Sequence, residues 1–136
     1  MNNNCIFCKI VKGESQSFKI YEDENTLSFM DNAGDVDGHI LVIPKKHYTN
    51  ILDIDNEALC HVMNTVKKIS NHLVDKCGYN GINLLNANDK SAGQSVFHYH
   101  IHIIPRKNND GIRAWPKLGK AKHKIEEMHQ KLKMIE

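Results

Sequence analysis

Three histidines alternate with apolar residues toward the carboxyl end of the chain. His98, His100 and His102 lie in the run Phe97-His-Tyr-His-Ile-His-Ile-Ile104. Side chains alternate between the two faces of a β-strand, so an extended run places the imidazoles in one row, about 7 Å apart, and the apolar side chains in the core. A neutral imidazole attacks phosphorus near pH 7 and also binds transition metals. The pattern therefore predicts nucleophilic catalysis or a metal site.

The residues before the histidine run favour phosphate chemistry. Asn86 ends a predicted strand, and Gly93 allows the backbone to approach a ligand closely. Gln94 and Ser95 supply neutral hydrogen-bond donors for phosphate oxygens. The usual phosphate-binding motifs, GxxxxGKS/T and GxGxxG, are absent from the sequence. A purely structural strand is the weaker interpretation, because threonine, lysine or serine would serve such a strand better than histidine.

Two cysteines near the amino end have the spacing of a metal half-site. Cys5-x-x-Cys8 supplies two of the four ligands of a tetrahedral zinc site. A redox pair is one alternative, but the βαβ context of that motif is not seen. Two buried thiols without a metal are the other alternative. No second CxxC exists, so two further ligands must come from elsewhere, and Cys60 and Cys77 are assigned no function.

The surrounding sequence predicts an antiparallel sheet that carries these residues. The predicted strands are Phe18–Tyr21, Thr26–Met30, Gly38–Ile43, Gly81–Leu85 and Ser95–Ile104. The first two strands form a hairpin, because the residues between them have turn character. Gly38–Ile43 is an almost continuous apolar run, which indicates a strand buried on both faces. Pro105 is expected to end the histidine strand, and Cys5–Gly13 to form a short turn or helix.

One long helix is expected to cover the sheet. Asp53–Lys76 has an apolar stripe at helical spacing, made of Leu59, Val62, Met63, Val66, Ile69 and Leu73. Asp53 or Asp55 can cap its start, and Gly78 can end it. A terminal helix is predicted around Ile125, Met128, Leu132 and Met134, after a polar segment with Trp115 as its one aromatic anchor. These elements indicate a single α+β domain over residues 1–136.

Composition excludes several classes of protein. The 136 residues carry 18 Lys and Arg against 16 Asp and Glu, a net charge of +2, which argues against nucleic-acid binding by bulk charge. No apolar run approaches the roughly 20 residues of a membrane span. The first residues lack the charged and apolar regions of a signal peptide, so the expected location is the cytoplasm.

These motifs resemble the histidine triad superfamily. The run Gln94–Ile104 is similar to the family signature, and Cys5–Ile10, Phe29–Asp31 and Gly38–His47 are similar to other family motifs. The resemblance covers residues 4–106 and leaves a tail over 107–136. It is strongest to the histidine triad nucleotide-binding branch, the purine nucleoside phosphoramidases, in its bacterial zinc-carrying form. It implies the histidine triad fold: a five-stranded antiparallel sheet with one long helix, followed here by a helical tail.

The resemblance also implies a hydrolase. His100 matches the nucleophile of the family, which attacks the α-phosphorus of an adenosine 5′-phosphoramidate and forms a covalent nucleotidyl-histidine that water converts to AMP. His39 would complete the histidine cluster around the phosphate. His102 would contact phosphate oxygens or the leaving group. Asp31 matches the residue that holds the ribose hydroxyls, and Asn86 matches an asparagine near the phosphate.

Further expectations follow from the same resemblance. His47 and His98 would join Cys5 and Cys8 in a closed, structural zinc site. The partners would be purine nucleotides such as AMP, GMP and adenosine phosphoramidates. A second copy of the chain would complete a homodimer through the long helices and sheet edges.

Two other functions stay open from the sequence. The chain can be a dinucleoside polyphosphate hydrolase or a nucleotidyl transferase, because both belong to the same superfamily. It can also be a nucleotide-binding protein without catalytic activity. Gln94 and Ser95 ahead of the histidine run favour the phosphoramidase branch.

Overall fold

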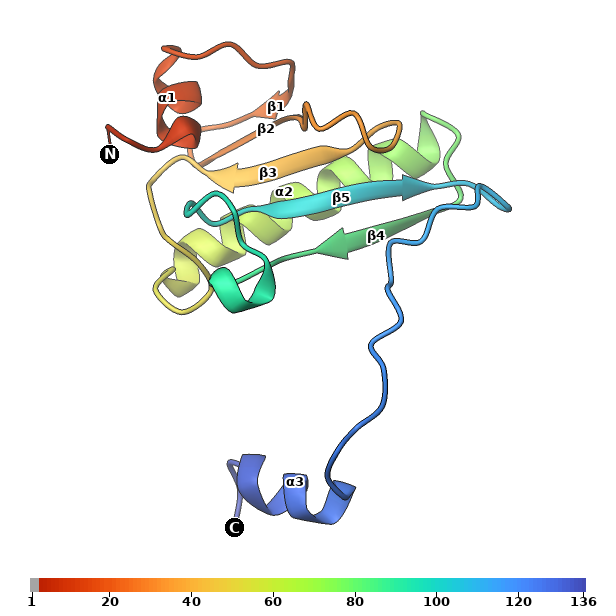
Figure 1. Ribbon diagram of the computed structural model, residues 1–136. Helices are drawn as coiled ribbons and strands as arrows, with labels where there is room; N and C mark the ends of the chain where they lie inside the picture. The colour runs from red at the N-terminus through yellow and green to blue at the C-terminus, as the bar shows by residue number, and fades with distance from the viewer. Residues whose placement is uncertain (1–2) are drawn as a thin grey trace.

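Five antiparallel strands form one sheet in the order β1-β2-β3-β5-β4 (Figure 1). They are β1 (Lys19–Glu22), β2 (Thr26–Met30), β3 (Ile40–Pro44), β4 (Gly81–Leu85) and β5 (Ile101–Arg106). The structure, a computed structural model, describes residues 3–136. The predicted hairpin of β1 and β2 is confirmed, and its turn is held by Asp23, whose carboxylate accepts from the backbone N–H groups of Asn25 and Thr26.

Strand β3 lies at the centre of the sheet and is buried on both faces, as predicted. Ile40 and Val42 face the core on the side of the long helix. Leu41 and Ile43 face a second core on the opposite side. The alternation follows from the period of two along a strand, and it explains why this segment has no polar positions.

Helix α2 (Asn56–Asp75) covers one face of the sheet (Figure 1). Asp55 caps it by accepting from the N–H of Ala58. The buried stripe is formed by Val62, Thr65, Val66, Ile69 and Leu73. The prediction that Met63 belongs to this stripe is wrong: its side chain is 40% exposed, whereas Thr65 is buried and shares a 2.7 Å hydrogen bond with Thr26 Oγ1.

Helix α1 (Ile6–Lys12) packs on the other face. Phe7, Cys8 and Ile10 are its buried residues. The Cys5 sulfur accepts from the N–H of Cys8 and caps the helix, and Gly13 ends it with a φ of 80°, a left-handed conformation that glycine adopts without strain. The predicted short helix closed by a glycine is therefore confirmed.

The histidine run joins the sheet later than predicted. Strand β5 begins at Ile101 rather than at Ser95, so His98 and His100 precede it. Pro44, the last residue of β3, has no N–H, and its carbonyl accepts from the His98 ring at 2.8 Å. The ladder between β3 and β5 therefore cannot continue in this direction.

Side chains alternate between the two faces of the sheet both on β5 and in the residues just before it. Tyr99, Ile101 and Ile103 are all buried in the core beneath α2, as predicted. Pro105 does not end the strand, because β5 pairs only with β4 at that position and needs no N–H toward β3.

The carboxyl-terminal tail extends away from the sheet (Figure 1). Its helix α3 (Ile125–Leu132) exists as predicted but has no buried residue. Trp115 is 77% exposed and does not anchor the tail. Among residues 3–136, no helix is both long and apolar enough to cross a membrane.

Candidate functional site

His100 is a buried histidine with one nitrogen held and one nitrogen free. Its ring Nδ1 donates to the backbone carbonyl of His98 at 2.7 Å, so Nε2 carries the lone pair. The edge-on ring of Phe7 lies 5.2 Å away, centre to centre. Burial lowers the pKa of His100, so the ring is neutral near pH 7. This is the form that a nucleophilic imidazole requires.

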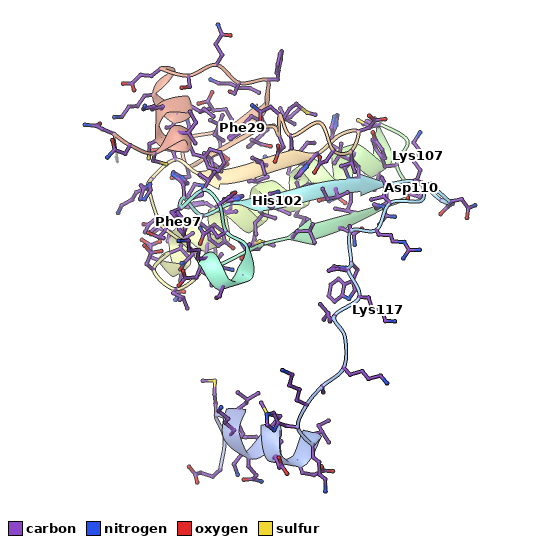
Figure 2. The ribbon with its side chains drawn as sticks, in the orientation of Figure 1. Phe29, Phe97, His102, Lys107, Asp110 and Lys117 are labelled. Atoms are coloured by element: carbon purple, nitrogen blue, oxygen red, sulfur yellow. The ribbon has the colours of Figure 1, made fainter. Side chains whose placement is uncertain are left out.

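His102 and His39 stand beside this ring. His102 lies on β5, near the middle of the sheet in Figure 2, with its ring centre 4.9 Å from that of His100. Its Nδ1 is 2.8 Å from Nε2 of His39, which directly precedes β3. Burial lowers the pKa of His102 to about 4, so this ring is also neutral at pH 7. The structure thus brings together His39, His100 and His102.

Asp31 follows β2 and lies next to the same cluster. Its backbone N–H donates to the carbonyl of His39 at 2.9 Å, and its Oδ2 lies 3.5 Å from His39 Nε2. The other oxygen accepts from the N–H of Ala33. A carboxylate with one oxygen held by the backbone is well suited to accept from further donors.

A pocket of about 700 Å³ opens between α1 and the end of β2. Asp31 and Ser95 are the predicted site residues that line it. Its apolar wall, which sequence reasoning did not single out, includes Ile6, Phe7, Ile10, Phe29 and Leu41. The available signal was the spacing of Phe29, on β2, and Asp31, which directly follows that strand. Because Phe7 also contacts the His100 ring, the pocket adjoins the histidine cluster.

Two predicted phosphate ligands make structural hydrogen bonds. Asn86 donates to the carbonyl of His100 at 2.8 Å and so fixes the backbone of that residue. Gln94 is buried, and its amide nitrogen donates to the carbonyls of Thr49 and Val96. Its amide oxygen accepts from the N–H of Asp89. Gln94 therefore holds the loop before the histidine run, and Ser95 is the exposed donor of the pair.

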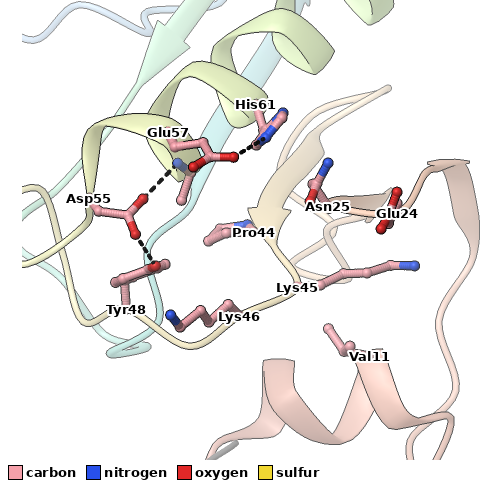
Figure 3. A pocket seen from close by; sticks show the side chains of 11 residues that line it. Val11, Glu24, Asn25, Pro44, Lys45, Lys46, Tyr48, Asp55, Glu57 and His61 are labelled. Atoms are coloured by element: carbon pink, nitrogen blue, oxygen red, sulfur yellow. Dashed lines mark hydrogen bonds and ion pairs between the residues drawn. The ribbon is translucent and has the colours of Figure 1, made fainter.

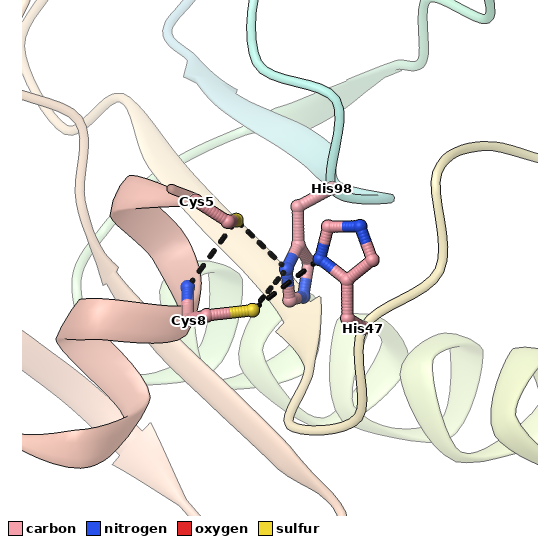
Figure 4. A group of neighbouring side chains, drawn as sticks. All are labelled: Cys5, Cys8, His47 and His98. Atoms are coloured by element: carbon pink, nitrogen blue, oxygen red, sulfur yellow. Dashed lines mark hydrogen bonds between the residues drawn. The ribbon is translucent and has the colours of Figure 1, made fainter. Parts of the chain in front are cut away.

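His98 belongs to a separate cluster with two thiols (Figure 4). Its Nδ1 lies 3.4 Å from the sulfur of Cys5 and 3.5 Å from that of Cys8. Nδ1 of His47 lies 3.3 Å from the Cys8 sulfur. All four ligand atoms lie within 4.8 Å of one another. The structure thus brings together the four predicted zinc ligands, from α1, the segment after β3 and the segment before β5.

This donor set fits a tetrahedral zinc ion. Zinc–sulfur and zinc–nitrogen bonds of about 2.3 and 2.0–2.1 Å imply sulfur–nitrogen edges of about 3.5 Å. The sulfur–nitrogen distances of 3.3–3.5 Å agree with that value. His98 Nε2 donates to the Pro44 carbonyl, which orients the Nδ1 lone pair toward the thiols. Burial lowers the pKa of His98 to about 4, which keeps it a neutral ligand.

A second hollow, of about 540 Å³, lies between the start of α2 and the end of β3 (Figure 3). Two of its carboxylates already have side-chain partners. Asp55 accepts from the hydroxyl of Tyr48 at 2.7 Å, and Glu57 lies 3.7 Å from the His61 ring. None of the predicted site residues lines this hollow. The candidate site is therefore the pocket beside the histidine cluster.

Comparison with known proteins decides the family. The sequence matches the HIT domain over residues 12–109. The chain belongs to the HIT domain family. The protein hit of Bacillus subtilis is 44% identical over 126 residues, which cover 92% of this chain and 87% of that protein. The adenosine 5′-monophosphoramidase of Candida albicans is 38% identical over 138 residues, which cover 96% of this chain and 90% of that protein.

A solved structure bears on the thiol cluster of this HIT domain. The zinc-bound histidine triad family protein from Mycobacterium smegmatis is 36% identical to this chain, with a TM-score of 0.75. The match covers 79% of this chain and 78% of that protein. The expected family and the histidine triad fold are both confirmed. In this HIT domain His98 directs its ring nitrogens to the thiols and Pro44, and it offers only its backbone carbonyl to His100.

Proposed function

We propose that this HIT domain hydrolyses adenosine 5′-phosphoramidates, or related nucleotidyl conjugates, to AMP through a covalent nucleotidyl-His100 intermediate. The observation that carries the proposal is the state of His100, which is buried, neutral and held at Nδ1, with Nε2 free to attack. The similarity to a protein named as an adenosine 5′-monophosphoramidase supports the substrate class.

The reaction has two balanced steps. In the first, the lone pair of His100 Nε2 attacks the α-phosphorus, and the bond from phosphorus to the leaving nitrogen breaks. The leaving nitrogen keeps the bonding pair and takes up a proton from the neighbouring His102. In the second step water attacks the phosphorus, the bonding pair returns to His100 Nε2 and AMP departs. The proton lost by the water replaces the one that left with the amine. Two easier displacements thus replace one difficult displacement.

The nucleoside occupies the pocket beside α1 in this proposal. Purine bases such as those of AMP and GMP pack against its apolar wall, and Asp31 accepts from the ribose hydroxyls. Ser95 donates to phosphate oxygens. Asn86 and Gln94 act on the phosphate site through the backbone that they hold, which is the role that their hydrogen bonds support.

The thiol cluster holds a structural zinc ion in this proposal. Cys5, Cys8, His47 and His98 form a closed shell with no open position, which suits a structural ion rather than a catalytic one. Zinc supplies the link between α1 and the two segments that carry the histidines. Through the carbonyl of His98, this link also fixes the ring of His100.

The proposed assembly is a homodimer. Strand β4 is an edge of the sheet, and its outer side has backbone groups free for pairing with a second copy. Leu84 on this strand is 44% exposed, and Met63 on α2 is 40% exposed. A second copy would cover this apolar surface.

Substitution of the nucleophile tests the proposed function. His100→Ala removes the attacking nitrogen but retains Asp31 and the apolar wall. We expect the AMP dissociation constant to change by less than about tenfold, while turnover of an adenosine phosphoramidate falls by several orders of magnitude. Mass spectrometry of rapidly quenched wild-type protein should find AMP on the peptide that contains residues 97–104.

His129→Ala is the matched control, because His129 is an exposed residue of α3. It should retain full turnover. Near-normal turnover in His100→Ala, or AMP attached to another histidine, would contradict the assignment. Turnover of diadenosine polyphosphates measured beside the phosphoramidate separates the phosphoramidase from a dinucleotide hydrolase.

A further inference from the structure

A second carboxylate reaches the histidine cluster from the loop between β2 and β3. Asp35 Oδ1 lies 2.9 Å from Nδ1 of His39. The loop is closed by the hydrogen bond from the N–H of Asp31 to the carbonyl of His39. Gly38, with a φ of 78°, turns the chain into β3, and a side chain there would meet Pro105 at 2.7 Å. The loop geometry thus fixes Asp35 opposite His39.

The Asp35 carboxylate determines which nitrogen of His39 bears hydrogen. The hydrogen bond from His39 lowers the pKa of Asp35, so this carboxylate is ionised at neutral pH. An ionised carboxylate only accepts hydrogen bonds, and His39 Nδ1 therefore carries an N–H. Nε2 is therefore the nitrogen of His39 that can exchange a proton. It lies 2.8 Å from Nδ1 of His102.

His39 and His102 together can hold one exchangeable proton. When the pair holds it, His39 Nε2–H donates to His102 Nδ1, and His102 presents an N–H at Nε2. When the pair has released it, His102 Nδ1–H donates to His39 Nε2, and His102 presents a lone pair at Nε2. The other ionisable groups that face the pair are Asp31, whose Oδ2 lies 3.5 Å from His39 Nε2, and the neutral ring of His100.

We propose that Asp35 is a positioning residue that makes His39 and His102 a proton relay for the leaving group. The inference rests on the proposed phosphoramidase function and assigns a role to a residue outside the histidine motif. Asp35 acts through His39 and does not touch the substrate. The arrangement follows the general logic of a base oriented by a buried or hydrogen-bonded carboxylate.

The proton balance of the relay closes over the two steps. As the bond from phosphorus to nitrogen breaks, the leaving nitrogen keeps the electron pair and takes the proton from His102 Nε2. His102 Nδ1 takes the proton from His39 Nε2, and Asp35 keeps the proton on His39 Nδ1. When water attacks in the second step, its proton goes to His102 Nε2. The Nδ1 proton of His102 then returns to His39 Nε2, which restores the starting state.

The same loop contains a matched control. Asp37 is exposed, carries the same charge, and has no side-chain partner among residues 3–136. Asp35→Ala and Asp37→Ala therefore remove one carboxylate each from neighbouring positions. Only the first removes the acceptor for His39. Asp35→Asn retains an acceptor oxygen without the charge, and it serves as a second variant of similar size.

The experiment compares two leaving groups in wild type and variants. Adenosine 5′-phosphoramidate releases an amine that must gain a proton, whereas the p-nitrophenyl ester of AMP releases a stable anion that needs none. We expect Asp35→Ala to lower turnover of the phosphoramidate by about 100-fold, within the range for general acid catalysis. The burst of nitrophenolate from the ester, and the AMP dissociation constant, should stay within about twofold of wild type. Asp35→Asn should retain the burst and show a smaller loss.

The outcomes separate the relay from the function on which it rests. An equal loss in the first step with both substrates, or weaker AMP binding in Asp35→Ala, shows a merely structural role and overturns the inference. So does unchanged phosphoramidate turnover, with Asp35→Ala equal to Asp37→Ala. If wild-type protein releases AMP from neither substrate, the proposed function itself is wrong and the relay falls with it.

Discussion

His98 and His100 are two residues apart, yet their rings serve different neighbours. The ring of His98 faces two thiols and the Pro44 carbonyl, and the ring of His100 is held by the carbonyl of His98. One backbone carbonyl thus decides which nitrogen of His100 is free. At this scale, what matters chemically is the hydrogen-bond partner of each nitrogen, because that partner fixes the tautomer.

The proposed contact of Asp31 with the ribose can be tested by a single substitution. If its carboxylate accepts from both ribose hydroxyls, Asp31→Ala should weaken binding of AMP by roughly 1.5–3 kcal/mol, the usual value for a charged hydrogen bond. The variant should also lose its preference for AMP over 2′-deoxy-AMP. Isothermal titration calorimetry with both nucleotides measures the two effects, and Asp37→Ala should behave as wild type. A variant that keeps the full ribose preference would place the hydroxyls elsewhere.

At the scale of elements, helix α1 is attached to the sheet by its own apolar residues and by the thiol cluster. Phe7 and Ile10 supply the first attachment, and Cys5 and Cys8 supply the second. A helix of 7 residues is too short to be stable alone in water. The proposed zinc ion would therefore contribute directly to the order of this helix.

Removal of one thiol tests that contribution. Cys5→Ala should abolish stoichiometric zinc, measured by elemental analysis of protein purified without a metal-affinity tag. It should also lower the melting temperature by at least about 5 °C, which corresponds to roughly 1–2 kcal/mol for a domain of this size. Cys60→Ala, which removes an exposed thiol, should change neither quantity. Equal melting of the two variants, with no zinc in the wild type, would contradict a structural metal site.

The sequence predicted the elements well where a local pattern was sufficient. The alternation of Tyr99, Ile101 and Ile103 and the limits of β4 follow from such patterns. The start of β5 does not, because it depends on a tertiary hydrogen bond from His98 to Pro44. The exposure of Met63 was also missed, since the edge of an apolar stripe looks the same in sequence as its centre.

The sequence predicted some parts of the candidate site better than others, because contacts between distant segments leave no local pattern. Residue types and spacing indicated the chemistry of the histidine run and of the CxxC pair. The contact of His39 with His102 and the assignment of His47 to the thiols needed the family resemblance, because these residues come from distant segments. The contact of Asp35 with His39 had no signal in the sequence, since it depends on the shape of a loop.

At the scale of the whole molecule, the exposed apolar surface includes two places that bear on assembly. One is the β4 edge with Leu84, and the other is the tail, where Ile125 and Leu132 are 79% and 66% exposed. Surface of this kind is typical of interfaces between copies of a chain. The two places are consistent with the proposed homodimer.

A charge placed on the sheet edge tests the dimer. Leu84→Arg adds a charged side chain to the edge strand, so we expect the variant to sediment as a monomer where the wild type sediments as a dimer. Phe18→Arg makes the same kind of change beside β1, the opposite edge, where Phe18 is 82% exposed. That variant should stay dimeric. A wild-type monomer at micromolar concentration, or a dimeric Leu84→Arg variant, would contradict the proposed interface.

The order in which the segments occur along the chain has a consequence for synthesis. Strand β5 is made last of the five strands but lies between β3 and β4, so the sheet stays in two separate parts until residues 101–106 exist. The thiol cluster has the same dependence, because Cys5 and His98 are 93 residues apart. A chain interrupted before His98 would carry three donor atoms, an open coordination position and a divided sheet. Completion of the proposed metal shell therefore coincides with completion of the sheet, and truncated products should lose both together.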